Sequence, residues 1–515
     1  MSSPAHPAHY TNLCALLTEV GTITSIAHLL NWDQETYMPP AAAAQRAEQI
    51  AFISALAHDK ATSHAIGDLI GDCERDQSLT ATATSPDARN IREMRRDYDH
   101  AAKIPTDLVA DLARTGSQAQ EVWKEAREKS DFALFEPWLE KMISLTRRKA
   151  ECLGVPPGGE LYDALLDQYE PGATAKQIEG IFTLLAARLS ALVKDLNSSG
   201  KKPSDAPLNV TIPAAQQHEV GQFVLRAMGF DFDAGRLDTT AHPFCSGIAA
   251  GDTRLTTRYR EQHWSDALYG TMHEGGHGLY DQGLPKRPPL LGTPLASDIS
   301  LGIHESQSRM WENFVGRGRE FWQWLLPHAR KMTAGADGRS PLDGFTPDQV
   351  YSAVNTATPS LIRVEADEAT YNLHVLIRFN IERGLISGAI KVRDLPGEWN
   401  AAYKKYLGVD VPDARRGCLQ DVHWAFGLIG YFPTYTLGNL YCAQLWETIN
   451  QQIPDLSAHM SRGDFTQLKK WLNTNIHSHG KRYRAGELCE MLTGKPLGAD
   501  PLLRHLEGKL RPIYR

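Results

Sequence analysis

The sequence has few cysteines, and they are not paired. There are seven of them, at widely separated positions and with no Cys-x-x-Cys pair. An even set of closely spaced cysteines is typical of a disulfide framework, and Cys-x-x-Cys pairs are typical of thiolate zinc sites. We therefore expect free thiols and a cytoplasmic protein.

The chain also lacks an excess of positive charge. Its formal net charge is −7, and its Lys and Arg residues are scattered along the sequence. This distribution excludes a basic surface of the kind that binds nucleic acid or anionic lipid. The partner that we expect is therefore a small or neutral molecule.

Targeting and membrane segments are the next features that we do not find. Residues 1–10 show neither a charged start nor an apolar core, so we expect no secretion signal. Elsewhere charges interrupt the apolar stretches before they reach the roughly 20 residues that a membrane helix needs. We therefore expect no membrane-spanning segment.

No Ser/Gly-rich or Pro-rich linker and no internal repeat divides the 515 residues, which predicts one large body. Helical periodicity dominates it, as in the apolar stripe with spacings of three and four over residues 178–196. β-Branched and aromatic residues between glycine-rich turns predict a few short strands in segments 208–212, 239–244 and 253–259. The predicted fold is mostly α, with a small β element just before residue 265.

One segment carries the chemistry: His273-Glu274-Gly275-Gly276-His277, in a helix predicted from Ser265 or Asp266 to Gly283. The two histidines are one turn apart on one face, so both imidazoles can bind one metal ion. Glu274 is turned away by roughly 100°, which suits a general base for metal-activated water. Two glycines inside a helix each cost about 1 kcal/mol relative to alanine. Close approach of substrate or of a neighbouring backbone would explain them.

A third metal ligand is expected, because catalytic zinc has three protein ligands and one open position. Glu305 lies 28 residues after His277 in a second predicted helix, and it is our choice. Two alternatives stay open. His304 could be a ligand or a substrate contact, and Glu305 could simply pair with Arg309 on a solvated face.

Further motifs follow in order along the chain. They are residues 32–39, 162–172, His242-Pro243-Phe244, Asp252 to Thr256, residues 273–277, His304 to Gln307, Ile362 to Asp367 and Gly417 to Trp424. With these motifs the sequence resembles the Taq-type zinc carboxypeptidases over nearly its whole length. The resemblance implies a metallocarboxypeptidase that removes single amino acids from peptide C-termini, with broad specificity.

The resemblance also implies an architecture: a large helical ellipsoid with a deep active-site cleft, related to angiotensin-converting enzyme and neurolysin. Within the single body 1–515 we assign an N-terminal helical region, 1–200, which forms part of the cleft, and a catalytic region, 201–515. One Zn²⁺ per subunit is implied, for which Co²⁺ can substitute, since His/His/Glu ligands suit several divalent metals. Peptide substrates and a homodimer are the implied partners.

Residues far along the chain receive roles from the same resemblance. His423 and Tyr431 resemble the histidine and tyrosine that stabilise the oxyanion in the angiotensin-converting-enzyme architecture, with Tyr435 the less favoured phenol. Arg363 lies in a family motif, and its guanidinium could bind the substrate carboxylate bidentately. Alternatively, Arg363 is a structural arginine neutralised by Glu365 or Asp367.

Weaker assignments concern residues near the strands and around the metal. His242 and Arg254 are candidate substrate contacts or turn-stabilising residues, and Asp298 and Asp421 are candidate acceptors for histidine N–H groups. Two rival functions are kept: an oligopeptidase or dipeptidyl carboxypeptidase of the same architecture, and a peptide-binding homologue without catalysis.

Overall fold

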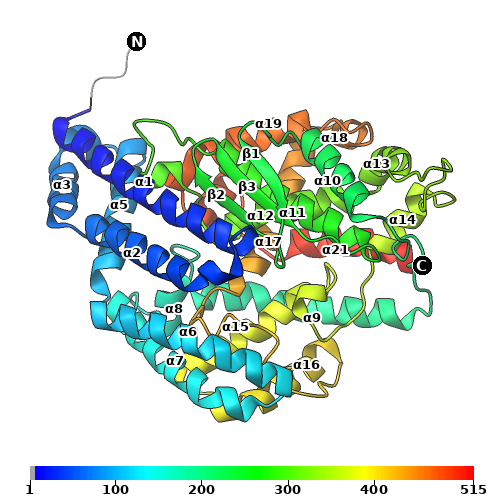
Figure 1. Ribbon diagram of the computed structural model, residues 1–515, viewed down its shortest axis with the longest axis horizontal. Coiled ribbons are helices and arrows are strands. Elements are labelled where there is room, and N and C mark those ends of the chain that lie inside the picture. Colours follow the sequence, from blue (N-terminus) through cyan, green and yellow to red (C-terminus); the bar gives the residue numbers. More distant parts are fainter. Residues whose placement is uncertain (1–5) are drawn as a thin grey trace.

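Helices make up most of the computed structural model, which describes residues 6–515. Residues 1–5 belong to the segment in which we expect no secretion signal, and they lie outside the described part. The prediction of a mostly α fold with a small β element is confirmed. Figure 1 shows the helices arranged around a short sheet in an elongated molecule.

The N-terminal half contains ten helices among the described residues: α1 Ala8–Thr36, α2 Ala43–Ala61, α3 His64–Arg75, α4 Gln77–Thr80, α5 Pro86–Lys103, α6 Thr106–Lys129, α7 Phe132–Leu153, α8 Leu161–Leu166, α9 Ala175–Ser198 and α10 Ala214–Met228. The stripe predicted over residues 178–196 is confirmed in α9, where six of its seven residues are buried. A Thr174–Gln177 capping box begins this helix.

After the sheet follow α11 Trp264–Gly283, α12 Leu301–Arg309, the π-helical turn η3 Met310–Gly316, α13 Arg319–Met332, α14 Pro347–Val354, α15 Tyr371–Ser387, α16 Leu395–Leu407, α17 Pro433–Gln452, α18 Leu456–Met460, α19 Thr466–Asn475, α20 Ala485–Thr493 and α21 Asp500–Tyr514. Short 3₁₀ turns lie at Pro40–Ala42, Pro294–Ala296, Arg363–Glu365, Val392–Asp394 and His477–Arg482.

The sheet has three strands, β1 Gly235–Thr239, β2 Cys245–Ala249 and β3 Asp252–Thr257, in the order β1-β3-β2. β1 pairs with β3 in parallel and β2 pairs with β3 in antiparallel. The strands predicted over residues 208–212 and 239–244 are wrong: the first segment is a turn and an irregular stretch, and the second, apart from Thr239, is the loop between β1 and β2. Ile212 is buried there, and its N–H bonds to the carbonyl of Glu261 in a loop instead of to a strand.

Helix α1 corrects the expectation that charges interrupt every apolar stretch. Its most apolar 18 residues have a mean hydropathy of 1.6, so by length and composition α1 could cross a membrane. In the structure α1 packs against α2, α3 and β2, although only 17% of that window is buried. Length and composition do not distinguish a membrane helix from a packed or a signal helix.

Two hydrophobic clusters form the core. The larger one extends from α6 to α21, and the smaller one joins apolar side chains of α1, α3, α4 and α5. Near the middle of the molecule, β3 contacts α11, α11 contacts α12, and α12 contacts α17 (Figure 1). The functional residues lie on these three central helices and on the loops that surround them. The division at residue 200 stays a prediction.

Candidate active site

Helix α11 carries the segment His273 to His277 and begins one residue before the predicted range, after His263. Neither Ser265 nor Asp266 caps it, and its first turn instead buries Trp264. The predicted end at Gly283 is confirmed.

The two glycines within α11 are explained by close packing on both sides. A Cβ on Gly276 would lie 2.6 Å from the carbonyl oxygen of Gln307 and 2.6 Å from the Cα of Ser308, so the backbones of α11 and α12 touch there. A Cβ on Gly275 would meet the side chain of Leu225 at 2.5 Å. The expected close approach of a neighbouring backbone is therefore present.

This contact brings Glu305 of α12 to the two histidines of α11. Ligand atoms of His273, His277 and Glu305 all lie within 4.8 Å of one another. The Nε2 atoms of the histidines lie 3.6 and 3.4 Å from Oε2 of Glu305, respectively. In a tetrahedral site with metal–ligand distances of about 2.0–2.1 Å, two ligand atoms are about 3.3 Å apart. The three donors thus fit a divalent ion such as zinc.

Buried charged side chains fix the orientation of these donors. Nδ1 of His273 lies 2.9 Å from Oε2 of Glu312, which leaves its Nε2 directed toward Glu305. Arg309 donates to Oε1 of Glu305 at 2.6 Å and to Glu312 at 3.1 Å. The predicted alternative pair of Glu305 with Arg309 therefore exists, but Glu305 is only 6% exposed and its second oxygen faces the histidines.

His304 contacts the opposite edge of His277. The two Nδ1 atoms are 2.5 Å apart, so one donates and the other accepts. If His277 donates, its Nε2 keeps a free lone pair for a metal. His304 thus lies behind a histidine of the cluster, and its ring also packs on Tyr280.

Glu274 is buried, being 6% exposed, and it makes no hydrogen bond to any residue that the structure describes. Burial raises the pKa of its carboxyl group to about 7, a shift that the charge of His273 opposes and the charge of Glu305 supports. A carboxylate with a raised pKa is a stronger proton acceptor near neutral pH. This is the protonation behaviour that a general base needs.

His423 and Tyr431 come together on the loop between α16 and α17. Their ring centroids are 5.6 Å apart, and Tyr431 also packs edge-on against Tyr435 at 5.4 Å. Burial raises the pKa of Tyr431, and the charge of Glu305 adds to the shift, which places this phenol in the electrostatic field of the cluster. Burial lowers the pKa of His423 to about 4.

Arg363 is buried and paired, with an exposed fraction of 4%. Its Nε and Nη2 both donate to Oδ1 of Asp421, at 3.1 and 2.8 Å, and its Nη1 donates to the hydroxyl of Tyr371 at 2.9 Å. The proposed neutralisation by Glu365 or Asp367 is wrong, because Asp421 provides the counter-charge. A guanidinium has five N–H groups, and three of them make these bonds, so two remain for a substrate.

The other sequence-based assignments have simpler surroundings. Arg254 forms a bidentate pair with Asp252 at 2.8 Å and lies over the ring of Trp32 at 4.2 Å. Neither Arg254 nor His242 hydrogen-bonds to the metal cluster in the described part of the chain. The acceptor for His273 is Glu312 instead of Asp298 or Asp421.

Sequence reasoning missed a buried carboxyl group that organises the loop of His423. Glu382 of α15 accepts from Trp424 Nε1 at 2.9 Å, from the Gly430 N–H at 3.0 Å and from the Tyr162 hydroxyl at 2.7 Å. Burial raises its pKa to about 7. Trp424 and Gly430 directly flank His423 and Tyr431, so one side chain fixes both. No local sequence signal links residues so far apart.

The sequence and the fold of this chain match those of known proteins. The family model described as carboxypeptidase Taq (M32) metallopeptidase matches residues 12–510. Thermostable carboxypeptidase 1 of Thermus thermophilus is 43% identical over 514 residues, covering 98% of this chain and 99% of the relative. Carboxypeptidase 1 of Bacillus subtilis is 38% identical, with 97% of each chain covered. The crystal structure of M32 carboxypeptidase from Deinococcus radiodurans superimposes with a TM-score of 0.93 at 39% identity, covering 99% of this chain and 100% of the other.

Proposed function

This chain belongs to the carboxypeptidase Taq (M32) family of metallopeptidases, and on that premise we propose that it removes single amino acids from peptide C-termini with broad specificity. The observation that carries the proposal is the convergence of His273, His277 and Glu305 in a buried site. Mass spectrometry of a digested peptide tests the length of the cut. We expect a ladder of single-residue losses, whereas paired or internal losses would favour a dipeptidyl carboxypeptidase or an oligopeptidase.

We propose zinc as the metal, one ion per subunit, with cobalt as a substitute. Two imidazole nitrogens and a carboxylate oxygen are a donor set that zinc favours, and no cysteine lies in the cluster. When bound, zinc supplies a Lewis acid that polarises a carbonyl group and lowers the pKa of water to about 7.

Removal of the metal is therefore expected to abolish hydrolysis. Dialysis against a chelator should reduce activity to background, and stoichiometric Zn²⁺ or Co²⁺ should restore it, because the protein residues alone provide no comparable electrophile. Metal analysis of the same samples would give the stoichiometry. Activity that survives in metal-free protein would contradict the assignment.

The protein residues divide the remaining chemistry. Glu274 accepts the proton of the attacking water and transfers it to the leaving amine. The imidazole of His423 and the phenol of Tyr431 donate to the carbonyl oxygen as negative charge develops there. Their contact with each other, the fixed position that Glu382 gives to their loop, and the field of Glu305 at Tyr431 support these roles.

We propose that Arg363 binds the free C-terminal carboxylate through its two remaining N–H groups, with Tyr435 packed against it at 5.1 Å. Asp421 and Tyr371 hold the guanidinium in one orientation, which reduces the entropy lost on binding. His304, His242 and Arg254 stay predicted substrate contacts.

Replacing Arg363 with alanine is expected to erase the preference for a free carboxylate over a C-terminal amide. The value of kcat/KM for the carboxylate peptide should fall by about a hundredfold or more, because a charge-assisted bidentate contact is lost, while that for the amide changes little. Arg363→Lys is the matched control, since it keeps the positive charge but not the bidentate guanidinium. Its kcat/KM for the carboxylate peptide should lie between those of the unaltered protein and Arg363→Ala. Unchanged discrimination would assign the carboxylate contact to another residue.

Two properties complete the proposal. We propose a cytoplasmic location, supported by seven cysteines that are all free. We also propose a homodimer, supported by the resemblance to the Taq-type family and testable by light scattering of the purified protein.

A further inference from the structure

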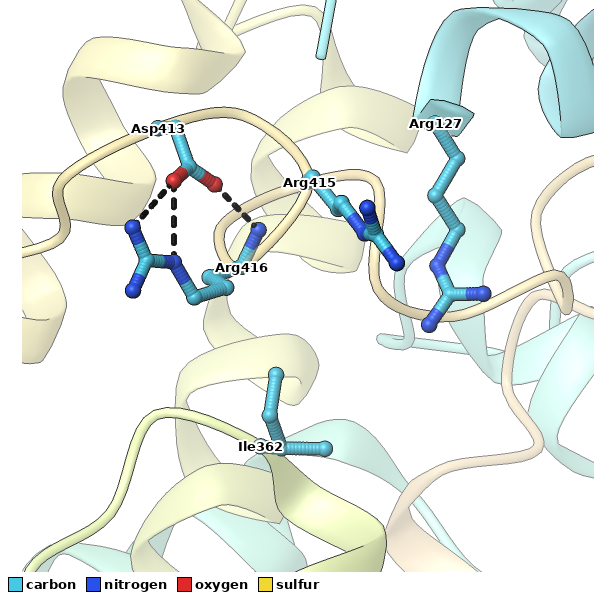
Figure 2. Close-up of a pocket in the computed structure, with 5 residues that line it drawn as sticks. All are labelled: Arg127, Ile362, Asp413, Arg415 and Arg416. Atoms are coloured by element: carbon cyan, nitrogen blue, oxygen red, sulfur yellow. Dashed lines mark hydrogen bonds and ion pairs between the residues drawn. The ribbon is translucent and has the colours of Figure 1, made fainter. Parts of the chain in front are cut away.

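A pocket of about 420 Å³ lies apart from the metal cluster. Figure 2 shows the residues that line it: Arg127, Ile362, Asp413, Arg415 and Arg416. Arg127 belongs to the last turn of α6, and the other charged residues belong to the loop before Gly417. Three arginines and one aspartate therefore line the pocket, and only Arg416 bonds to Asp413.

The charges in this pocket do not balance. Asp413 is committed to Arg416, from which it accepts the Nε–H at 2.8 Å and the backbone N–H at 2.8 Å. Arg127 and Arg415 form no side-chain hydrogen bond or ion pair with any residue that the structure describes, and Nε of Arg127 is buried without a partner. Two positive charges thus remain uncompensated in a chain with a net charge of −7.

Arg127 is held in place even though it is unpaired. The guanidinium of Arg127 lies 5.5 Å from the centre of the Trp123 ring, and Trp123 is itself fixed by donating to the carbonyl of Leu419 at 3.0 Å. Such stacking orients a guanidinium while leaving its N–H edge available.

The loop that carries Arg415 is tied to the end of α6. Ser130 has φ 55°, and it is the single non-glycine residue with a left-handed backbone in the described part of the chain. Its hydroxyl accepts the backbone N–H of Arg415 at 3.0 Å, which ties the loop to the end of α6. A left-handed residue commonly ends a helix, and Ser130 is the C-cap of α6, so its contact fixes the backbone of Arg415 relative to this helix.

The pocket is linked to Arg363 of the proposed active site by the chain and by one hydrogen bond. Ile362 precedes Arg363, and the N–H of Arg363 donates to the side chain of Gln420 at 2.9 Å. Gln420 lies in the same loop as Arg415 and precedes Asp421, the counter-charge of Arg363. An occupant of the pocket would therefore contact the loop that holds Arg363.

We propose that Arg127 and Arg415 form an anion-binding site that takes a carboxylate group. Planar guanidinium edges match a carboxylate in bidentate geometry, and the volume of the pocket suits a small dicarboxylate or an acidic side chain. The carboxylate comes either from an acidic residue of a peptide substrate or from a free anion, and the site requires no metal.

Calorimetric titration with glutarate tests the site directly. The variant Arg127→Ala/Arg415→Ala should bind glutarate at least tenfold more weakly than the unaltered protein, because both charge-assisted contacts are lost. The control Arg114→Ala/Arg393→Ala also removes two positive charges, but from exposed positions, one of them on α6. It should bind glutarate within twofold of the unaltered protein. Equal affinity in all three proteins, or an equal loss in both variants, would overturn the proposal.

A variant that should strengthen binding tests whether misfolding causes the loss of affinity in the double variant. Asp413→Asn releases Arg416 and should strengthen glutarate binding several-fold, which a damaged fold does not produce; unchanged or weaker binding would count against the site.

Peptides with glutamate or glutamine near the C-terminus then identify the source of the carboxylate. A rise in KM confined to the glutamate peptide in the double variant indicates a substrate carboxylate, and equal KM values beside lost glutarate binding indicate a free anion.

Discussion

Glu274→Gln is expected to lose at least a factor of about 10³ in kcat while keeping its metal. Glutamine has the size and shape of glutamate but cannot accept a proton at neutral pH, and general base catalysis alone contributes about 10² to 10⁴. The wild-type carboxyl group is buried and has a pKa raised to about 7, so its contribution should be large. Metal analysis together with steady-state kinetics measures both parts of the prediction.

His277→Ala is the matched control for this variant. It removes a donor of the cluster and should lose metal and activity together, whereas Glu274→Gln should lose activity only. Full hydrolysis by Glu274→Gln would exclude Glu274 as the base, and loss of its metal would make it a ligand.

Gly276→Ala is expected to disrupt the site without touching a charged group. The new Cβ would lie 2.6 Å from the backbone of Gln307 and of Ser308, and a backbone cannot rotate away as a side chain can. Helices α11 and α12 must separate, which moves Glu305 away from the histidines. A misplacement of this order can cost about a hundredfold in rate, and overpacking typically costs about 1–3 kcal/mol of stability.

Gly275→Ala provides the comparison on the same helix. Its Cβ would meet the ends of the Leu225 and Met228 side chains, which can adopt other rotamers. The helix gains up to about 1 kcal/mol from replacing glycine by alanine. The melting temperature, the metal affinity and kcat should therefore fall much further in Gly276→Ala than in Gly275→Ala. Equal effects would show that the α11–α12 contact does not position Glu305.

The two histidine donors could be predicted from sequence because their pattern is local. His273 and His277 are one helical turn apart, and the two glycines between them required an explanation that the structure supplies as a backbone contact. The helix stripe over residues 178–196 was readable for the same reason, since its period lies within one element.

The partners of these donors could not be read in this way. Glu312 reaches His273 through a π-helical turn that has no simple sequence period, and Asp421 meets Arg363 across 58 residues. Glu365 and Asp367 were nearer in sequence but are not the counter-charge. The strand predicted at 208–212 failed because Ile212 is buried by tertiary packing, Leu208 and Val210 are half-buried, and no strand lies alongside to pair with them.

Glycine contacts on both sides of α12 bear on which ions the site can accept. Gly276 lets α11 approach one side of this helix, and a Cβ on Gly438 of α17 would lie 2.6 Å from Cγ of Glu305 on the other. Glu305 therefore has little room to move outward when a larger ion enters. Calcium prefers six to eight oxygen ligands at about 2.3–2.6 Å, and two imidazoles with one carboxylate that cannot move apart provide neither that distance nor that donor set. The packing of three helices thus selects by ionic radius, in addition to the selection by ligand chemistry.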